Sequence, residues 1–123
     1  MPRYARIDAP GALQHVIVRG IERREIFRDD ADRREFLARL ERSLTETRTP
    51  CTAWALMSNH FHLLLETGKK PVGRVMQSVL TSYAVYFNKR HRRSGHLFQN
   101  RYKSILCEKE SYRISPAIYI FPS

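Results

Sequence analysis

Several features that place a chain in a familiar class of protein are scarce in this sequence. Two cysteines among 123 residues are too few for a disulfide framework or a metal cluster, so we expect reduced thiols. No apolar run approaches the roughly 18 residues of a membrane span, and the N-terminus lacks the apolar core of a signal peptide. No internal repeat or Walker-type glycine loop is present. We therefore expect one cytoplasmic domain over residues 1–123, with no membrane partner.

Acidic side chains are also in short supply. Twelve Asp and Glu oppose 22 Lys and Arg, which leaves a formal net charge of +10. A surface this basic usually binds a polyanion, most often a nucleic acid, although a basic protein without such a partner would show the same balance. Hydrophobic residues make up 42% of the chain, which favours a folded core over a disordered segment.

The pattern of apolar residues predicts alternating strands and helices. Asp29 is a good helix cap, and Phe36, Leu40 and Leu44 after it form one apolar stripe. Pro71 suits the first turn of a second, longer helix. The expected elements are strand 13–19, a helix from 29 to 49, strands 52–57 and 60–67, a helix from 71 to 90, a polar loop 91–100, strand 101–108 and a short helix 110–121.

The order β-α-β-β-α-β-α predicts an α+β fold of the ferredoxin-like split βαβ type. Four strands would form one antiparallel sheet with two helices packed on it, and a short C-terminal helix would be added to this sandwich. The second and fourth strands are the outer strands in that topology. Cys51 and Cys107 would then lie on opposite edges, too far apart for a disulfide.

The sharpest local feature is His60-Phe61-His62 in the segment NHFHLLLE. Side chains alternate across a strand, so both histidines would project from one face while Phe61 packs beneath the helices. Two imidazoles a few ångströms apart on a rigid strand are suited to hold a metal ion. Exposed or hydrogen-bonded histidines without a metal would produce the same pattern.

A second feature is a basic and aromatic stretch between residues 86 and 103, which holds six Lys or Arg and no acidic residue. Such cations attract phosphates, and unstacked bases stack on aromatic or guanidinium planes. A solvated charged loop is the alternative. The side chains that we expect to contact nucleic acid are Arg19, Asn59, Lys89, Arg90, Arg92, Arg93, Gln99, Arg101 and Lys103.

Two tyrosines near the C-terminus form the third feature. Tyr112 and Tyr119 are seven residues apart, so a regular helix would place them on nearly the same face, about 10.5 Å apart. Only one of them could reach a given metal ion. A tyrosine hydroxyl beside a divalent cation could attack a phosphate; without the other two features, both tyrosines would be interpreted as packing residues.

Taken together, these segments resemble a known family. The blocks PGALQHVIVRG, AWALMSNHFHLLLET and MQSVLTSYAVYFNKRHRRSGHLFQNRYKSI are similar to the single-tyrosine HUH transposases. Within that group the chain resembles the REP-associated branch of the insertion-sequence 200-like transposases. The similarity runs from about Pro10 to Tyr119, and it is specific because three separated blocks agree in order and spacing.

The resemblance implies an enzyme that cuts and rejoins single-stranded DNA near hairpins. In such enzymes two histidines, here His60 and His62, hold Mg²⁺ or Mn²⁺. A tyrosine near the C-terminus, here Tyr119 with Tyr112 as the substitute, attacks the scissile phosphate and forms a 5′-phosphotyrosine intermediate. The implied partner is single-stranded or hairpin DNA, which would associate the protein with the nucleoid, and relatives occur both as monomers and as homodimers.

The end of the sequence departs from the family's pattern. Ser123 stands where relatives carry a polar third metal ligand, and the usual Asn-Pro after the tyrosine is missing. Pro116 falls inside the expected terminal helix, where it removes a hydrogen bond. We therefore expect a domain truncated at its C-terminus. Two interpretations remain: a metal-dependent transposase, impaired or not by its short end, and a non-catalytic basic module that only binds nucleic acid.

Overall fold

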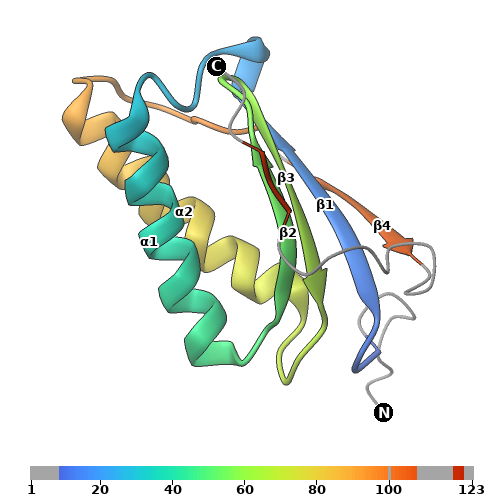
Figure 1. Cartoon of the computed structure of the whole chain (residues 1–123). Helices are drawn as coiled ribbons and strands as arrows, with labels where there is room; N and C mark the ends of the chain where they lie inside the picture. Colours follow the sequence, from blue (N-terminus) through green and yellow to red (C-terminus); the bar gives the residue numbers. More distant parts are fainter. Residues whose placement is uncertain (1–8, 100, 108–117, 121–123) are drawn as a thin grey trace.

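The computed structural model describes residues 9–99, 101–107 and 118–120, the last three as backbone only. The chain forms a five-stranded sheet of order β4-β1-β3-β2-β5 with two long helices on one of its faces (Figure 1). The elements are β1 (Leu13–Arg19), a 3₁₀ turn η2 (Ile21–Arg23), α1 (Asp30–Thr47), β2 (Cys51–Leu56), β3 (His60–Glu66), α2 (Val72–Arg90), β4 (Lys103–Cys107) and β5 (Ile118–Ile120).

The first four strands confirm the predicted fold class. β4, β1, β3 and β2 are antiparallel throughout, and α1 and α2 connect them as a split βαβ sandwich requires. β2 and β4 are the outer strands of this four-stranded part. Cys51 and Cys107, on these two strands, are free thiols, as expected.

The C-terminal segment differs from the prediction of a short helix. Ile118–Ile120 forms a strand that pairs in parallel with β2, with Tyr119 opposite Trp54. Two β-branched isoleucines flanking an aromatic residue fit a pleated strand better than a helix. Pro116, just before them in the sequence, has no N–H for a helical hydrogen bond. The helix prediction is therefore wrong at 118–120, and the rest of 110–121 lies outside the described residues.

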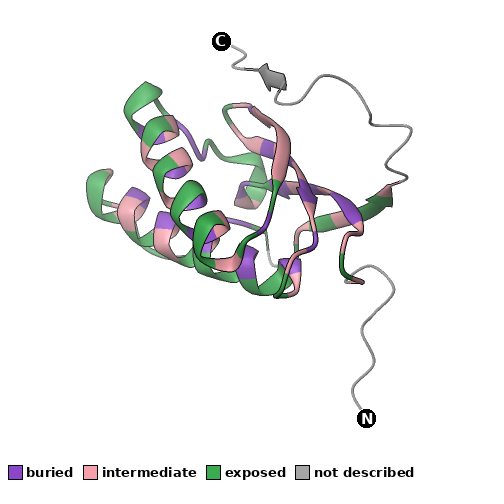
Figure 2. Ribbon diagram, turned by 60° about the horizontal axis from the view of Figure 1, so that its bottom comes forward, coloured by how far each residue is buried: buried purple, intermediate pink, exposed green. Residues whose placement is uncertain are grey.

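The core lies between the helices and the sheet, where the buried residues gather (Figure 2). Phe36 of α1, Phe61 of β3 and Tyr83 of α2 are fully buried, with ring centroids 4.6 Å apart for Phe36–Phe61 and 5.4 Å for Phe36–Tyr83. Each aromatic side chain buries a large apolar area, so this cluster is one of the main contributions to the core. Their packing fixes β3 against both helices, and so fixes which face of β3 stays open.

The ends of the helices follow the local sequence. Asp29 caps α1 by accepting a hydrogen bond from the Asp32 N–H at 3.0 Å, as expected for an acidic N-cap. α2 begins directly after Pro71, whose fixed φ suits that position. Among the described residues, neither helix combines the length and the hydrophobicity that a bilayer crossing requires.

Candidate active site

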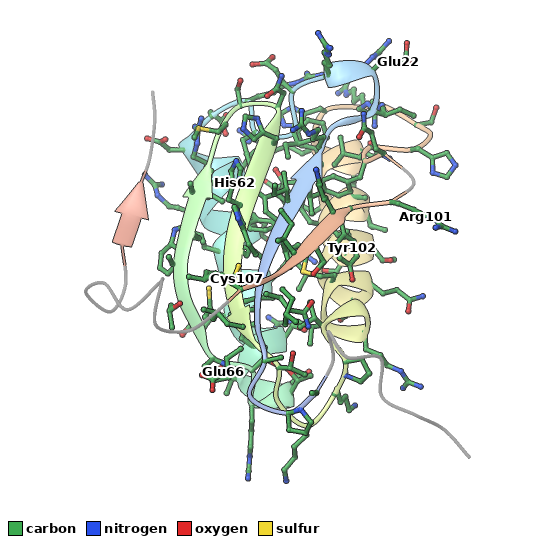
Figure 3. All side chains as sticks on the ribbon, turned by 90° about the vertical axis from the view of Figure 1, so that its right-hand side faces the viewer. Glu22, His62, Glu66, Arg101, Tyr102 and Cys107 are labelled. Carbon is green, nitrogen blue, oxygen red and sulfur yellow. The ribbon has the colours of Figure 1, made fainter. Side chains whose placement is uncertain are left out.

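β3 carries the predicted metal ligands on the sheet face that the helices leave open. Along this strand Phe61 and Leu63 are buried against the helices, whereas His60 and His62 are only partly buried. Figure 3 shows this open face, with His62 on it. The centroids of the two imidazole rings lie 5.1 Å apart. The alternation of side chains along β3 thus brings both rings together on one surface.

Two further side chains contact these imidazoles. His15 of β1 places its Nε2 atom 3.0 Å from Nδ1 of His62, and the centroids of the two rings are 5.2 Å apart. Asn59, directly before β3, places its Oδ1 atom 2.8 Å from Nδ1 of His60. Each histidine of the pair is therefore held at Nδ1 by a different neighbour, which leaves its Nε2 for another partner.

The surroundings favour neutral imidazoles. Burial lowers the pKa of His15, His60 and His62 below the ordinary value of 6.5. The positive charge of Arg19 lowers the pKa of His60 and His62 further, and the two neighbouring histidines add to the effect at His62. A neutral imidazole has a free lone pair, which is the form that binds metal ions.

The register of the sheet places two of the predicted DNA contacts beside the histidines. Arg19 lies opposite His60 on the adjacent strand. Ile17 of β1 lies opposite both His62 and Lys103, so Lys103 occupies the same row of the sheet as His62, two strands away. Because paired residues point to the same face of a sheet, this row belongs to the open face.

The basic segment that follows α2, residues 91–99, ends beside Arg19, at the end of the sheet where His60 lies. The Gln99 N–H donates to the Arg19 carbonyl at 3.0 Å, and Gly20 forms a bridge with Phe98. The segment is therefore attached next to His60. The predicted DNA contacts that are exposed to solvent are Arg19, Lys89, Arg90, Arg92, Gln99, Arg101 and Lys103.

Besides Asn59, two of the predicted DNA contacts use their side chains in internal bonds. Arg90 forms ion pairs of 2.7 Å with Asp29 and 2.6 Å with Asp32. Arg93 donates to Oδ1 of Asn88 at 2.8 Å and to the backbone carbonyl of His96 at 3.0 Å. Arg90 thus joins the end of α2 to the start of α1, and Arg93 holds the loop after α2. The contact of both side chains with DNA stays a prediction.

The predicted nucleophile lies on the added strand. Tyr119 of β5 is opposite Trp54, which is in turn opposite Leu63, a residue buried against the helices, whereas Ile120 is opposite Ala55 and so shares the row of His62. Because paired residues share a face of the sheet, the register does not bring Tyr119 into the row of the histidines, and its role as the nucleophile stays a prediction. Two strand spacings separate β5 from β3, or roughly 10 Å between backbones. Tyr112, the substitute nucleophile, and Ser123, at the position of the third ligand, lie outside the described residues.

Comparison with known protein families shows the family to which this chain belongs. Residues 10–120 match the family model described as "Transposase IS200 like". The chain belongs to the IS200-like transposase family. The resemblance of the three sequence blocks is thereby confirmed at the level of the family. No curated protein sequence gives a significant match to this transposase.

Two solved structures resemble this IS200-like transposase in fold. A REP-associated tyrosine transposase bound to a REP hairpin superposes with a TM-score of 0.68 at 13% identity, covering 92% of this chain and 67% of that one. A protein of Deinococcus radiodurans R1, described as a candidate transposase, gives a TM-score of 0.65 at 15% identity and covers 91% of both chains. At these identities the similarity supports the fold alone.

The donors of this IS200-like transposase fit a divalent metal in part. His60 and His62 offer two neutral imidazole nitrogens from one rigid strand, which suits Mg²⁺ or Mn²⁺ less than softer ions but is compatible with open coordination positions for phosphate and water. Within the described residues, no group of three His, Cys, Asp or Glu side chains is arranged to hold a metal ion. A divalent ion held by the histidine pair would therefore need further ligands.

Sequence reasoning missed His15, and it assigned Asn59 to DNA without seeing its contact with His60. His15 stands in the segment LQHVIVR, where Val16 and Val18 alternate with it, so its side of the strand could be predicted. Its contact with His62 depends on the register of β1 against β3, which no local pattern in the sequence specifies.

Proposed function

We propose that this IS200-like transposase is a metal-dependent, single-tyrosine HUH endonuclease and strand transferase. It cleaves and rejoins single-stranded DNA near hairpins through a 5′-phosphotyrosine intermediate. The observation that carries the proposal is the pair of imidazoles of His60 and His62, with ring centroids 5.1 Å apart, on the open face of the sheet at the end where the basic segment is attached. Burial lowers the pKa of both rings, which favours the neutral form that binds metal ions. Association with the nucleoid would follow from DNA binding.

The histidines and the tyrosine have separate roles in the proposed reaction. His60 and His62 would hold Mg²⁺ or Mn²⁺, which when bound polarises the oxygens of the scissile phosphate. The Tyr119 oxygen attacks phosphorus, its proton leaves to solvent, and the bond from phosphorus to O3′ breaks as O3′ takes up a proton. Attack by a 3′-OH on the phosphotyrosine reverses the step, so rejoining needs no ATP.

The charge around the histidines supports a DNA substrate. Arg19 faces His60 across the strand pair and Lys103 shares the row of His62, so two cations flank the proposed metal position. Lys89, in the last turn of α2, and Arg92, just after that helix, add further exposed cations. Cations placed in this way position the phosphate backbone without reading its sequence. The DNA-bound relative, a transposase on a REP hairpin, makes a hairpin the natural first substrate to test.

The same basic surface would also serve a protein that binds DNA without cutting it, and the test must separate these two functions. End-labelled single-stranded DNA containing a hairpin, taken from the flanks of this transposase's own gene, is incubated with the protein in Mn²⁺, Mg²⁺ or EDTA. A denaturing gel then reports covalent protein–DNA adducts, and a native gel reports binding.

The proposal predicts an adduct in Mn²⁺ or Mg²⁺ that is absent in EDTA and absent in His62→Ala and Tyr119→Phe. Tyr112→Phe is the matched control and should keep the adduct. An adduct that disappears in Tyr112→Phe but persists in Tyr119→Phe would reassign the nucleophile. Binding without any adduct would mean that the protein is a non-catalytic DNA-binding module.

A further inference from the structure

The Nδ1 atoms of both metal-binding histidines are engaged by neighbours that the proposed reaction does not use. The geometry points to Asn59 and His15 as positioning residues, which hold His60 and His62 with the ring proton on Nδ1 and the lone pair of Nε2 directed to the metal. This inference rests on the proposed function, because it concerns the metal site of that reaction.

The role of Asn59 follows from the orientation of its amide. The Nδ2 group donates to the backbone carbonyl of Arg23 at 3.4 Å, and this contact turns the amide oxygen toward His60. That oxygen lies 2.8 Å from Nδ1 of His60. An amide oxygen only accepts hydrogen bonds, so Nδ1 of His60 must carry the proton. Nε2 of His60 then carries the free lone pair.

The turn that presents Asn59 is itself fixed to the segment that follows β1. The Asn59 carbonyl accepts from the Gly20 N–H at 2.9 Å, and the neighbouring Ser58 carbonyl accepts from the Ile26 N–H at 2.7 Å. These hydrogen bonds therefore hold the backbone of Asn59 in place. A side chain on a fixed backbone restricts the orientation of the imidazole that it contacts. Residues that hydrogen-bond a metal-binding histidine in this way set its tautomer and its direction.

His15 has the corresponding place at His62. Its Nε2 lies 3.0 Å from Nδ1 of His62, so one of these nitrogens donates a proton and the other accepts it. If His15 donates, His62 carries its proton on Nε2 and cannot bind a metal there. If His62 donates, its Nε2 is free. Only the second arrangement agrees with metal binding, and in it His15 is protonated on Nδ1.

His15 is better suited to this supporting role than to being a third ligand. Its Nε2 faces a ring nitrogen of His62, and the described residues contain no three-ligand group of His, Cys, Asp or Glu. His15 comes from β1, whereas Asn59 comes from the turn before β3. The positions of His15 and Asn59, and with them the proposed metal site, therefore depend on correct pairing of β1 with β3.

The first readout needs no metal ion and no DNA. Long-range ¹H–¹⁵N correlation spectra of the ¹⁵N-labelled, metal-free protein report which ring nitrogen of each histidine carries the proton. We expect the Nδ1–H tautomer for His60 and for His62. The Nε2–H tautomer in either ring would overturn the inference for that ring.

The second readout is Mn²⁺ affinity, measured by calorimetry on the whole chain. Asn59→Ala and His15→Leu remove one support each and should weaken Mn²⁺ binding about 10- to 100-fold, the usual effect of losing such a partner. His15→Gln keeps an acceptor close to the position of Nε2, and Asn59→Asp keeps an acceptor oxygen, so both should recover most of the affinity. Ile105→Ala, opposite His15 on β4, is the matched control and should bind as wild type does.

The outcomes separate this inference from the proposed function. If wild type binds Mn²⁺ and both loss variants bind it equally well, while their ¹H–¹⁵N spectra show a folded chain, the positioning role is wrong and the metal site stands. If His62→Ala binds Mn²⁺ as tightly as wild type, the proposed metal site itself is wrong, and the inference fails with it.

Discussion

Single residues on the open face of the sheet set the charge and the pKa values at the proposed site. His60 and His62 were predictable from the HxH spacing, because alternation along a strand needs no knowledge of the rest of the fold. The position of Arg19 beside this site was not predictable in the same way. Arg19 lies opposite His60 only because β1 and β3 pair in one particular register.

The charge of Arg19 should be detectable in the titration of its neighbours. Burial is the main cause of the lowered pKa of His60, and Arg19 adds to it. In Arg19→Gln the cation is lost, so the pKa of His60 and, less strongly, of His62 should rise toward 6.5. Titration of the metal-free protein by NMR measures both values. An unchanged or lower pKa in the variant would contradict this electrostatic arrangement.

Contacts between elements explain how the helices and the basic segment are held. Asp32 of α1 is fully buried and accepts hydrogen bonds from the Arg28 N–H, Tyr86, Arg90 and His91. This cluster joins the start of α1 to the end of α2, where the basic segment begins. The helices themselves were predictable from their apolar stripes, but this polar cluster was not, because its members are about 60 positions apart in the sequence.

Asp32 should therefore contribute to stability in a pH-dependent way. Burial by itself would raise its pKa, but the hydrogen bonds from Arg28, Arg90, Tyr86 and His91 outweigh it and lower the pKa below 3.8. A lowered pKa in the folded state stabilises the protein above pH 3.8, and this contribution is lost as the pH falls further. Asp32→Asn should lower the free energy of unfolding by about 3 kcal/mol at pH 7. It should also make that free energy less dependent on pH below pH 4, and urea unfolding measures both effects. An acid dependence as steep as that of wild type would contradict this role.

Gly20 joins β1 to the turn at the His60 end of the sheet. A Cβ atom added there would collide with the backbone carbonyl oxygen of Arg24. Gly20→Ala should lower the free energy of unfolding by about 1–3 kcal/mol, because backbone must move to make room. Gly73→Ala in α2 is the matched control: its added Cβ would lie 3.3 Å from the Tyr102 hydroxyl, and alanine favours a helix, so the change should stay under about 1 kcal/mol. Equal effects of the two substitutions in urea unfolding would count against the tight turn.

At the scale of the whole molecule, the net charge of +10 predicted a polyanionic partner but not where it binds. The fold attaches the segment after α2 beside the histidines, through Gln99 and Arg19. Other cations, including Lys69 and Lys70, follow the opposite end of β3, next to α2's start. The parallel strand β5 was missed, since three residues carry too little pattern to predict their pairing with β2.

This distribution of charge predicts an asymmetric response to charge reversal. The double variant Lys89→Glu/Arg92→Glu should weaken binding to hairpin-containing single-stranded DNA and flatten its salt dependence, which scales with the number of phosphates neutralised. Lys69→Glu/Lys70→Glu changes the net charge by the same amount at the far end of β3 and should have a smaller effect. Fluorescence anisotropy over a series of salt concentrations measures both, and equal losses would show that only the total charge matters.

The most direct measurement is to locate the DNA on the protein. The covalent adduct formed in Mn²⁺ is digested with nuclease and protease, and mass spectrometry identifies the peptide that retains a nucleotide. The account predicts the nucleotide on Tyr119, attached through a 5′-phosphate. A nucleotide on any other residue, or no modified peptide from a preparation that binds both Mn²⁺ and DNA, would contradict it.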